Sequence, residues 1–444
     1  MSKLEDHPTV RQFRTKATSA NRPEAIIDAD ELRRLCLDAG ADDVGFVSIS
    51  RAELDDQRDD ILAFFPATKT LISIVCRMNR EPIRNPARSV ANLEFHETTD
   101  HVNTVAHEIV RRLEARGHRA INPPAGFPME ITHFPGKVWL VSHKPVAVAA
   151  GLGCMGIHRN VIHPKFGNFI LLGTILLEAE VSEESRTVEF NPCLSCKLCV
   201  AACPVGAISP DGSFNFVSCY THNYREFMGG FTDWVETVAD SHSARDLRRK
   251  VSDAESASMW QSLAYGPNYK AAYCLSVCPA GEDVIPPFLE NRAGFVESTL
   301  KPLQAKAETL YVQPGTDAEE YASKRFPHKS IKHTGNTLRP TSIDSFIRGM
   351  HIVFQPGRSK DLNAVYHFQF TGEQPGSYTI SIRDQKIEVR DGIQGNCDLR
   401  VTASARPWLK FLRKEVSIVW LLLTLRVHLR GNPMLLVKFG KCFP

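Results

Sequence analysis

Four cysteines lie within eleven residues near the middle of the chain. Cys193, Cys196, Cys199 and Cys203 have the spacing C-x2-C-x2-C-x3-C, and Pro204 follows the last of them. Three thiolates at such short intervals can hold three corners of a cubane, and the fourth thiolate in a run of this kind ligates a different iron–sulfur cluster. A zinc site usually combines two C-x2-C pairs that lie far apart in sequence. The spacing therefore favours iron–sulfur chemistry, which is electron transfer or reduction.

Two later cysteines, Cys274 and Cys278, repeat the last part of this motif as C-x3-C-P. Because the last thiolate of each run serves the other cluster, we predict two clusters of the 4Fe-4S type with exchanged ligands. The predicted ligands of the first cluster are Cys193, Cys196, Cys199 and Cys278, and those of the second are Cys203, Cys219 and Cys274.

The second cluster lacks an eighth cysteine. A complete second motif would place one three residues before Cys274, where Ala271 stands. Three alternatives stay open: a 3Fe-4S cluster, a non-cysteine ligand, or another thiol such as Cys154. The remaining cysteines are predicted to be small hydrophobic residues; they are Cys36, Cys76, Cys397 and Cys442.

The bulk composition is that of an ordinary globular protein. A chain of 444 residues is too long for one core, so two or three domains are expected. The net charge of +3 gives no reason to expect nucleic acid as a partner. Positive charge is nevertheless concentrated at the end, where residues 401–444 contain eight Lys or Arg and one acid, Glu415. A solvated face is the simpler interpretation, and peripheral contact with anionic lipid or an acidic partner is the alternative.

The chain carries no recognisable export or membrane-spanning signal. Residues 1–24 are polar, without the apolar core of a signal peptide. The longest apolar run, residues 416–425, is about half of what spans a bilayer. We therefore expect a cytoplasmic protein without a transmembrane segment, in which twelve reduced cysteines serve as metal ligands or core residues.

The sequence divides into five predicted regions. Residues 1–25 are polar and are expected to form a flexible tail. Residues 26–185 mix helical and strand patterns, which predicts an α/β domain for a cofactor or substrate, and residues 186–300 form the ferredoxin-type domain. Residues 301–340 are polar with a Pro-Gly pair and are expected to be a linker. Residues 341–444 form an α+β domain.

Apolar periodicity predicts individual elements within these regions. In the α/β domain it predicts helices over 27–39 and 102–116 and strands over 70–76, 138–142 and 169–177. In the last region, apolar residues alternate with polar ones between positions 366 and 403, with turn signals between the runs. This pattern predicts an antiparallel meander, followed by a helix over 407–425.

A glycine-rich stretch lies shortly before the cysteines. Gly151, Gly153 and Gly156 satisfy the pattern G-x-G-x-x-G, which is also found in dinucleotide sites. Such a site needs a long helix that starts in the loop, whereas Pro164 and Gly167 interrupt the chain soon afterwards. The pattern instead favours a close backbone approach to another ligand or to the cluster domain.

This glycine stretch also carries a family likeness. Residues 149–156 (AAGLGCMG), residues 160–167 (NVIHPKFG) and the cysteine motif, in this order, resemble the epoxyqueuosine reductase and reductive dehalogenase superfamily. The likeness covers residues 26–295. It implies a nitroreductase-related α/β domain that holds cobalamin, beside a ferredoxin domain with two 4Fe-4S clusters supplied by a donor such as ferredoxin or flavodoxin. Gly151, Gly153, Cys154 and Gly156 would then lie close to the corrin.

The chain departs from this family at one position of interest. Epoxyqueuosine reductases carry an acidic residue shortly before the glycine loop, whereas residues 141–145 here read VSHKP and contain no carboxylate. His143 is the candidate proton donor, because an imidazole can donate near neutral pH. A structural histidine is the alternative, and Lys144 is interpreted as a surface or anion-pairing group.

The last hundred residues resemble a sterol-carrier-protein type 2 domain. The likeness rests on residues 364–370, 378–390 and 426–432. It implies a curved sheet and helices around an apolar tunnel for acyl chains or sterols. Residues 416–425, with Trp408 and Phe411, would line that tunnel or else belong to a plain core.

Together these features predict an iron–sulfur oxidoreductase. Electrons would pass through two clusters to a bound cofactor, with cobalamin as the candidate, and reduce a hydrophobic small molecule or lipid that the last domain presents. One alternative is a non-catalytic electron carrier or adaptor with a lipid-binding domain. Another is a lipid-binding protein whose cluster is structural or sensory.

Overall fold

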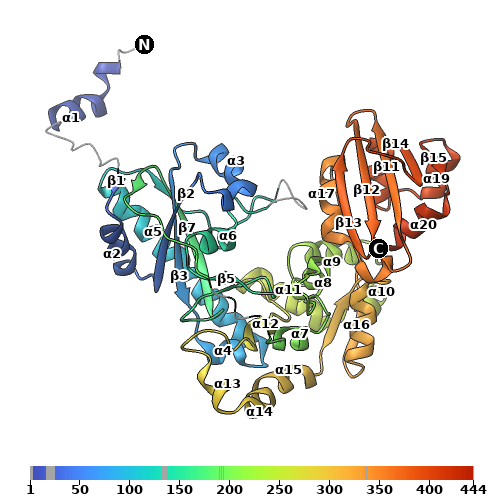
Figure 1. The fold of residues 1–444 in the computed structure, drawn as a ribbon, viewed down its shortest axis with the longest axis horizontal. Helices are drawn as coiled ribbons and strands as arrows, with labels where there is room; N and C mark the ends of the chain where they lie inside the picture. Colours follow the sequence, from blue (N-terminus) through green and yellow to red (C-terminus); the bar gives the residue numbers. More distant parts are fainter. Residues whose placement is uncertain are drawn as a thin grey trace.

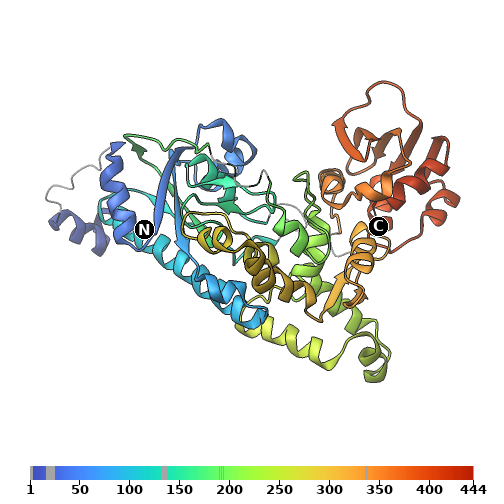
Figure 2. The same ribbon diagram turned by 60° about the horizontal axis from the view of Figure 1, so that its bottom comes forward.

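The computed structural model describes residues 4–16, 26–131, 138–189, 191, 193, 195–335 and 339–443. Three regions follow one another along the long axis of the molecule (Figures 1 and 2): an N-terminal sheet domain, a helical region that carries the cysteines, and a C-terminal sheet domain. Within the predicted flexible tail, residues Pro8–Lys16 form helix α1, after a short 3-10 turn at Leu4–Asp6.

The N-terminal domain has three layers. Its central sheet has the order β2-β3-β7-β4, and each pair of strands is antiparallel. Two helices pack on one face and two on the other, which explains why β3 and β7 are apolar along nearly their whole length. The strands are β2 (Asp43–Ser48), β3 (Thr70–Arg77), β7 (Ile170–Leu177) and β4 (Ala120–Ile121), and the helices are α2 (Ala29–Asp38) with α5 (Arg88–Ala115) and α3 (Asp55–Phe64) with α6 (His143–Ala149).

Most of the elements predicted for this domain are present. The helix predicted over 102–116 is the second half of the longer α5. The strand predicted over 138–142 is wrong, because Val138 and Val141 are buried in irregular backbone and α6 begins at His143. Pro145 stands in the first turn of that helix, a position that proline tolerates. The smaller elements are β1 (Ile26–Ile27), α4 (Arg80–Arg84), β5 (Cys154–Met155), β6 (Val161–Ile162) and β8 (Glu180–Val181).

The cysteine region is built from short helices around the thiols. An insertion of three helices lies between Cys219 and Cys274. The guanidinium of Arg225 links the first and the last of these helices. This buried group pairs with Asp233 at 2.5 Å and Glu255 at 2.8 Å. The helices are α7 (Leu198–Ala202), α8 (Phe216–Asn223), α9 (Gly229–Ala239), α10 (Ala244–Lys250), α11 (Asp253–Tyr265), α12 (Tyr273–Ser276), α13 (Pro286–Glu290) and α14 (Arg292–Phe295), followed by a π-helical turn at Val296–Leu300.

The predicted linker is wrong as far as His333. Residues 301–333 form a helix, a strand, a second helix and a second strand, and the two strands pair in parallel. Leu303, Val312 and Ala318 are buried in the same core as Cys199 and Cys203. The segment is therefore part of the cysteine region; its elements are α15 (Lys301–Ala305), β9 (Thr309–Val312), α16 (Asp317–Arg325) and β10 (Ser330–His333).

The C-terminal domain is a five-stranded sheet with the order β13-β12-β11-β14-β15. The meander prediction holds for the first three strands, but β14 pairs with β11 in parallel. The predicted helix over 407–425 is two helices, α18 and α19, broken near Lys414, which has a positive φ of 63°. The elements are α17 (Ile343–Val353), β11 (Ala364–Thr371), β12 (Gly376–Arg383), β13 (Lys386–Asp391), β14 (Leu399–Ser404), α18 (Ala405–Leu412), α19 (Ile418–Leu423), β15 (Val427–Gly431) and α20 (Met434–Lys441).

Buried aromatic residues fill the core of this domain. A helix contact and several hydrogen bonds join the domain to the cysteine region. Helix α17 contacts α8. The buried amide of Gln355 accepts hydrogen bonds from the backbone N–H of Asp317 at 3.1 Å and from Nδ2 of Asn215 at 3.5 Å. The backbone N–H of Gly357 donates to Asp317 Oδ2 at 2.8 Å. The core aromatic residues include Tyr366, Phe368, Phe370 and Trp408.

Candidate functional site

Four of the predicted ligands lie near one another, at α7 and just after α12. Cys193 and Cys196 lie in the loop before this helix, Cys199 lies within it, and Cys278 follows α12. Burial raises the pKa of Cys278 to about 12, and the neighbouring thiols of Cys196 and Cys193 add to the rise. Burial also raises the pKa of Cys199, and the thiols of Cys274, Cys278, Cys196 and Cys193 add to the rise. We call these residues the four-thiol set.

The other three predicted ligands lie next to the four-thiol set. Cys203 follows α7, Cys219 lies in α8 and Cys274 lies in α12. Burial raises the pKa of Cys274 to about 11, and the thiol of Cys203 adds to it. The pKa of Cys219 is raised by burial and by the same two thiols. We call these residues the three-thiol set; Cys274 also raises the pKa of Cys199, so the two sets are neighbours.

Backbone amides surround one sulfur of the three-thiol set. The N–H of Ala207 donates to Cys203 Sγ at 3.2 Å, and the N–H groups of Val205, Gly206 and Ile208 also point to it. Gly206 makes this turn possible because it has a positive φ of 63°. Hydrogen bonds to ligand sulfurs are a recurrent feature of iron–sulfur sites, where they tune the potential. This arrangement fits a thiolate that carries a metal cluster.

The cysteines outside the two sets differ in their surroundings. All twelve cysteines are free thiols. Burial raises the pKa of Cys36 and of Cys76 to about 12, and no other thiol contributes to either rise, as expected for core residues. Within the described ranges, no three His, Cys, Asp or Glu side chains converge as closely as a single metal ion requires. Ligation of clusters by the two sets stays a prediction.

The position of the missing eighth cysteine is buried at the three-thiol set. Ala271 packs in the same core as Cys203 and Cys274. Cys154, the alternative thiol, lies instead with Cys193 and Cys278 at the four-thiol set. The structure therefore speaks against Cys154 as the ligand that completes the second cluster.

A lysine and an asparagine from the N-terminal domain reach the three-thiol set. Lys144, in α6, donates from Nζ to the carbonyl of Arg159 at 2.7 Å and to Asn160 Oδ1 at 2.9 Å. Asn160 Nδ2 lies 4.0 Å from Cys274 Sγ. Burial raises the pKa of Cys219 and of Cys274, and the positive charge of Lys144 opposes both rises.

The sequence interpretation missed the role of Asn160, whereas Lys144 is exposed and its charge acts on nearby thiols, in line with its interpretation. Lys144 was expected to be a surface or anion-pairing group, and Asn160 was only part of the family likeness. Their presence within residues 141–145 and the NVIHPKFG stretch was the available signal. That stretch also touches the residues after Cys278, because the N–H of Glu282 donates to Pro164 O at 2.9 Å.

His143, the candidate proton donor, has both ring nitrogens engaged. Nε2 lies 3.0 Å from the carbonyl oxygen of Pro124, so it must donate there, and Nδ1 accepts from Thr174 Oγ1 at 2.9 Å. Burial lowers the pKa of this imidazole. The geometry fits a structural histidine that ties α6 to the sheet.

The three loop glycines are required by packing within the chain. A Cβ atom on Gly151 would lie 2.1 Å from Arg186 O, one on Gly153 would lie 2.3 Å from Ile162 O, and one on Gly156 would meet the His158 ring at 2.7 Å. Gly151 and Gly153 also have positive φ. These contacts account for the glycines by packing within the chain, so the glycines do not by themselves indicate a corrin site.

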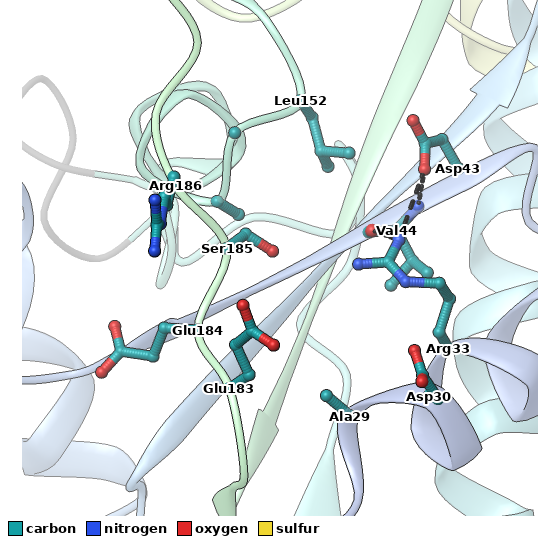
Figure 3. Close-up of a pocket in the computed structure, with 12 residues that line it drawn as sticks. Ala29, Asp30, Arg33, Asp43, Val44, Leu152, Glu183, Glu184, Ser185 and Arg186 are labelled. Carbon is teal, nitrogen blue, oxygen red and sulfur yellow. Dashed lines mark hydrogen bonds and ion pairs between the residues drawn. The ribbon is translucent and has the colours of Figure 1, made fainter.

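Part of this loop lines a polar pocket of about 340 Å³ (Figure 3). Its lining includes Gly151, Leu152 and Arg186 but no cysteine. Arg33 points into it and is already engaged, since its Nη1 donates to the Val44 carbonyl at 2.7 Å and pairs with Asp43 at 3.8 Å. This pocket is separate from both thiol sets.

Comparison with known proteins identifies two parts of the chain. Residues 187–209 match the 4Fe-4S binding domain, and residues 355–444 match the SCP-2 sterol transfer family. These matches confirm the 4Fe-4S motif and the resemblance to a sterol-carrier-protein type 2 domain. The curated epoxyqueuosine reductase of Leadbetterella byssophila is 30% identical over 118 residues, which cover 24% of this chain and 38% of that protein. The enzyme of Gloeobacter violaceus is 26% identical over 216 residues, which cover 45% of this chain and 61% of that protein.

The chain thus spans less than two thirds of the length of these curated relatives. Among solved structures, epoxyqueuosine reductase from Streptococcus thermophilus aligns with a TM-score of 0.34 and 16% identity, over 61% of this chain and 74% of that one. Among the described residues, no helix is both long and apolar enough to cross a bilayer.

Proposed function

We propose that this chain is an iron–sulfur oxidoreductase that passes electrons through two cysteine-ligated clusters. The observation that carries the proposal is that seven cysteines lie near one another, so that their thiols raise one another's pKa. The match of residues 187–209 to the 4Fe-4S binding domain supports it. The partial similarity to epoxyqueuosine reductases supports reduction as the class of reaction.

The chain's own residues would perform three tasks around the clusters. When bound, the clusters supply one-electron transfer. The thiols hold them, and the amides of residues 205–208 stabilise the negative charge at Cys203. Lys144 places a positive charge beside Cys219 and Cys274, which favours arrival of an electron at the three-thiol set.

The glycine loop gives no support of its own for a corrin as the acceptor of the electrons. The family likeness implies cobalamin. However, the chain's own atoms already occupy the space where a Cβ atom of Gly151, Gly153 or Gly156 would lie. The proposed reaction therefore includes no step on a corrin. The match of residues 355–444 to the SCP-2 family favours a hydrophobic small molecule or lipid as the ligand of the C-terminal domain.

One observation favours a second function, that of a non-catalytic electron carrier or adaptor. His143 has no free ring nitrogen for proton donation, and residues 141–145 contain no carboxylate. A carrier needs no proton donor at this position. Reduction of the clusters without turnover, together with a partner reductase that depends on this chain, would support that function.

The test of the main proposal is anaerobic purification with analysis of iron, labile sulfide and cobalt. We expect about seven or eight iron atoms per chain, with matching sulfide. Visible and low-temperature EPR spectra then distinguish 3Fe from 4Fe centres and reveal any corrinoid. A colourless protein that contains zinc in place of iron and sulfide would contradict the proposal.

A further inference from the structure

The C-terminal domain presents an apolar helix to solvent. All six residues of α19 are apolar, yet only Leu421 is fully buried. Val419, Trp420 and Leu423 are 60%, 49% and 79% exposed. Leu425, just after the helix, is 69% exposed. Single exposed apolar residues are ordinary, but several together on one element mark an interaction surface.

The same edge of the domain carries a second apolar patch. Met434 and Val437 of α20 are exposed, while Phe439 of the same helix is buried in the core. Figure 1 places α19, β15 and α20 at the outer edge of the molecule, away from the N-terminal domain. We call this surface, made by residues 418–441, the outer face. The expectation that residues 416–425 line an enclosed tunnel is wrong for the exposed side chains of α19.

Cationic side chains accompany the apolar ones. Six exposed Lys or Arg residues lie on or beside the outer face, and in the described part of the chain none of them forms an ion pair. Glu415, the one acid of residues 401–444, lies 3.9 Å from Arg413. The six residues are Lys410, Lys414, Arg426, Arg430, Lys438 and Lys441.

We propose that the outer face binds the surface of an anionic lipid bilayer. An exposed apolar helix that contains Trp and is flanked by unpaired cations is the arrangement that lies in the interfacial region of a membrane. Each Lys or Arg near an anionic leaflet adds attraction, whereas a second copy of this face would bring like charges together. The proposal depends only on the C-terminal domain and is independent of the proposed redox function.

The test uses the full chain and two kinds of vesicle, phosphatidylcholine alone and phosphatidylcholine mixed with phosphatidylserine. We expect co-sedimentation with the mixed vesicles, weakened by salt, and a blue shift of tryptophan emission. The double variant Trp420→Ser, Leu423→Ser and the double variant Lys438→Glu, Lys441→Glu should each bind more than about tenfold more weakly. Because these side chains are exposed, the variants should retain the thermal midpoint of the wild type.

Matched controls come from other surfaces. Leu263→Ser on α11 changes another exposed leucine, and Lys386→Glu changes a lysine at the opposite edge of the same sheet. Both should bind mixed vesicles like the wild type. The proposal is overturned if the wild type ignores mixed vesicles, if it binds both vesicle types equally, or if concentration-dependent dimers, rather than vesicles, shift the emission.

Discussion

The two thiol sets come from one repeated motif but are built differently. The four-thiol set draws three thiols from a single short run and is completed by Cys278. The three-thiol set takes each thiol from a different segment and has Ala271 where a fourth would stand. Helix α8, which carries Cys219, precedes the helical insertion, and α12, which carries Cys274, follows it. The N-terminal domain contributes Lys144 to the three-thiol set. The comparison teaches that three thiols of the four-thiol set are encoded by short spacing, whereas Cys278 and the three-thiol set depend on long-range packing.

Loss of one thiol from the four-thiol set should have the largest effect. In Cys196→Ala the set keeps too few thiols for a stable 4Fe-4S cluster, so about four iron atoms per chain should disappear while the three-thiol set retains its iron. Iron and labile sulfide analysis measures this. Cys36→Ala changes a buried cysteine outside both sets and should leave the iron content intact. Equal loss of iron from both sets would show that they do not assemble independently.

Disruption of the insertion should affect the three-thiol set selectively. Arg225→Met leaves Asp233 without its buried cation and Glu255 with Lys332 alone, which costs about 3–5 kcal/mol of unfolding free energy. We expect a lower thermal midpoint and iron loss from the three-thiol set first. Arg249→Met breaks an exposed pair with Asp246 and should cost less than about 1 kcal/mol. Unchanged iron retention in the Arg225 variant would separate the insertion from the cluster.

A fourth thiol should make the two sets more alike. Ala271→Cys adds a thiol at the position where a complete motif would have one, so a 3Fe centre should gain about one iron atom and its EPR signal should disappear. Ala280→Cys adds a thiol beside Cys278, where the set is already complete, and should gain no iron. If the wild type already contains a 4Fe centre with a non-cysteine ligand, the iron count will not rise.

Removal of one charge should give the smallest effect. Lys144→Gln removes positive charge beside Cys219 and Cys274, so the potential of the three-thiol cluster should fall while that of the four-thiol cluster stays constant. Lys144→Arg retains the charge and should shift the potential less. Redox titration monitored by EPR separates the two centres. Identical potentials in all three proteins would remove Lys144 from the tuning of either set.

The sequence predicted what depends on short spacing. The proximity of Cys193, Cys196, Cys199 and Cys203 could be anticipated because they lie within eleven residues of one another. The contact between Lys144 and the three-thiol set could not, because it arises where two domains meet. The hydrogen bonding of His143 could not be anticipated either, because it depends on Thr174, a strand residue far along the chain.

Two errors have a common physical origin. The segment after residue 300 looked like a linker because α16 buries small side chains, Ala318 and Ala322, which give little apolar signal. In the C-terminal domain, alternation revealed which side chains face the core but not which strand is the neighbour. The sequence therefore could not show that β14 pairs with β11 in parallel, although the pattern of burial along β14 is regular.

The hydrogen bonds of Gln355 have a mechanical consequence. Asn215, to which this side chain binds, stands four residues before Cys219, one helical turn away. A rotation of the C-terminal domain during uptake or release of a ligand would have to strain or break these amide contacts. The strain would reach the predicted ligand Cys219 through a single turn of helix.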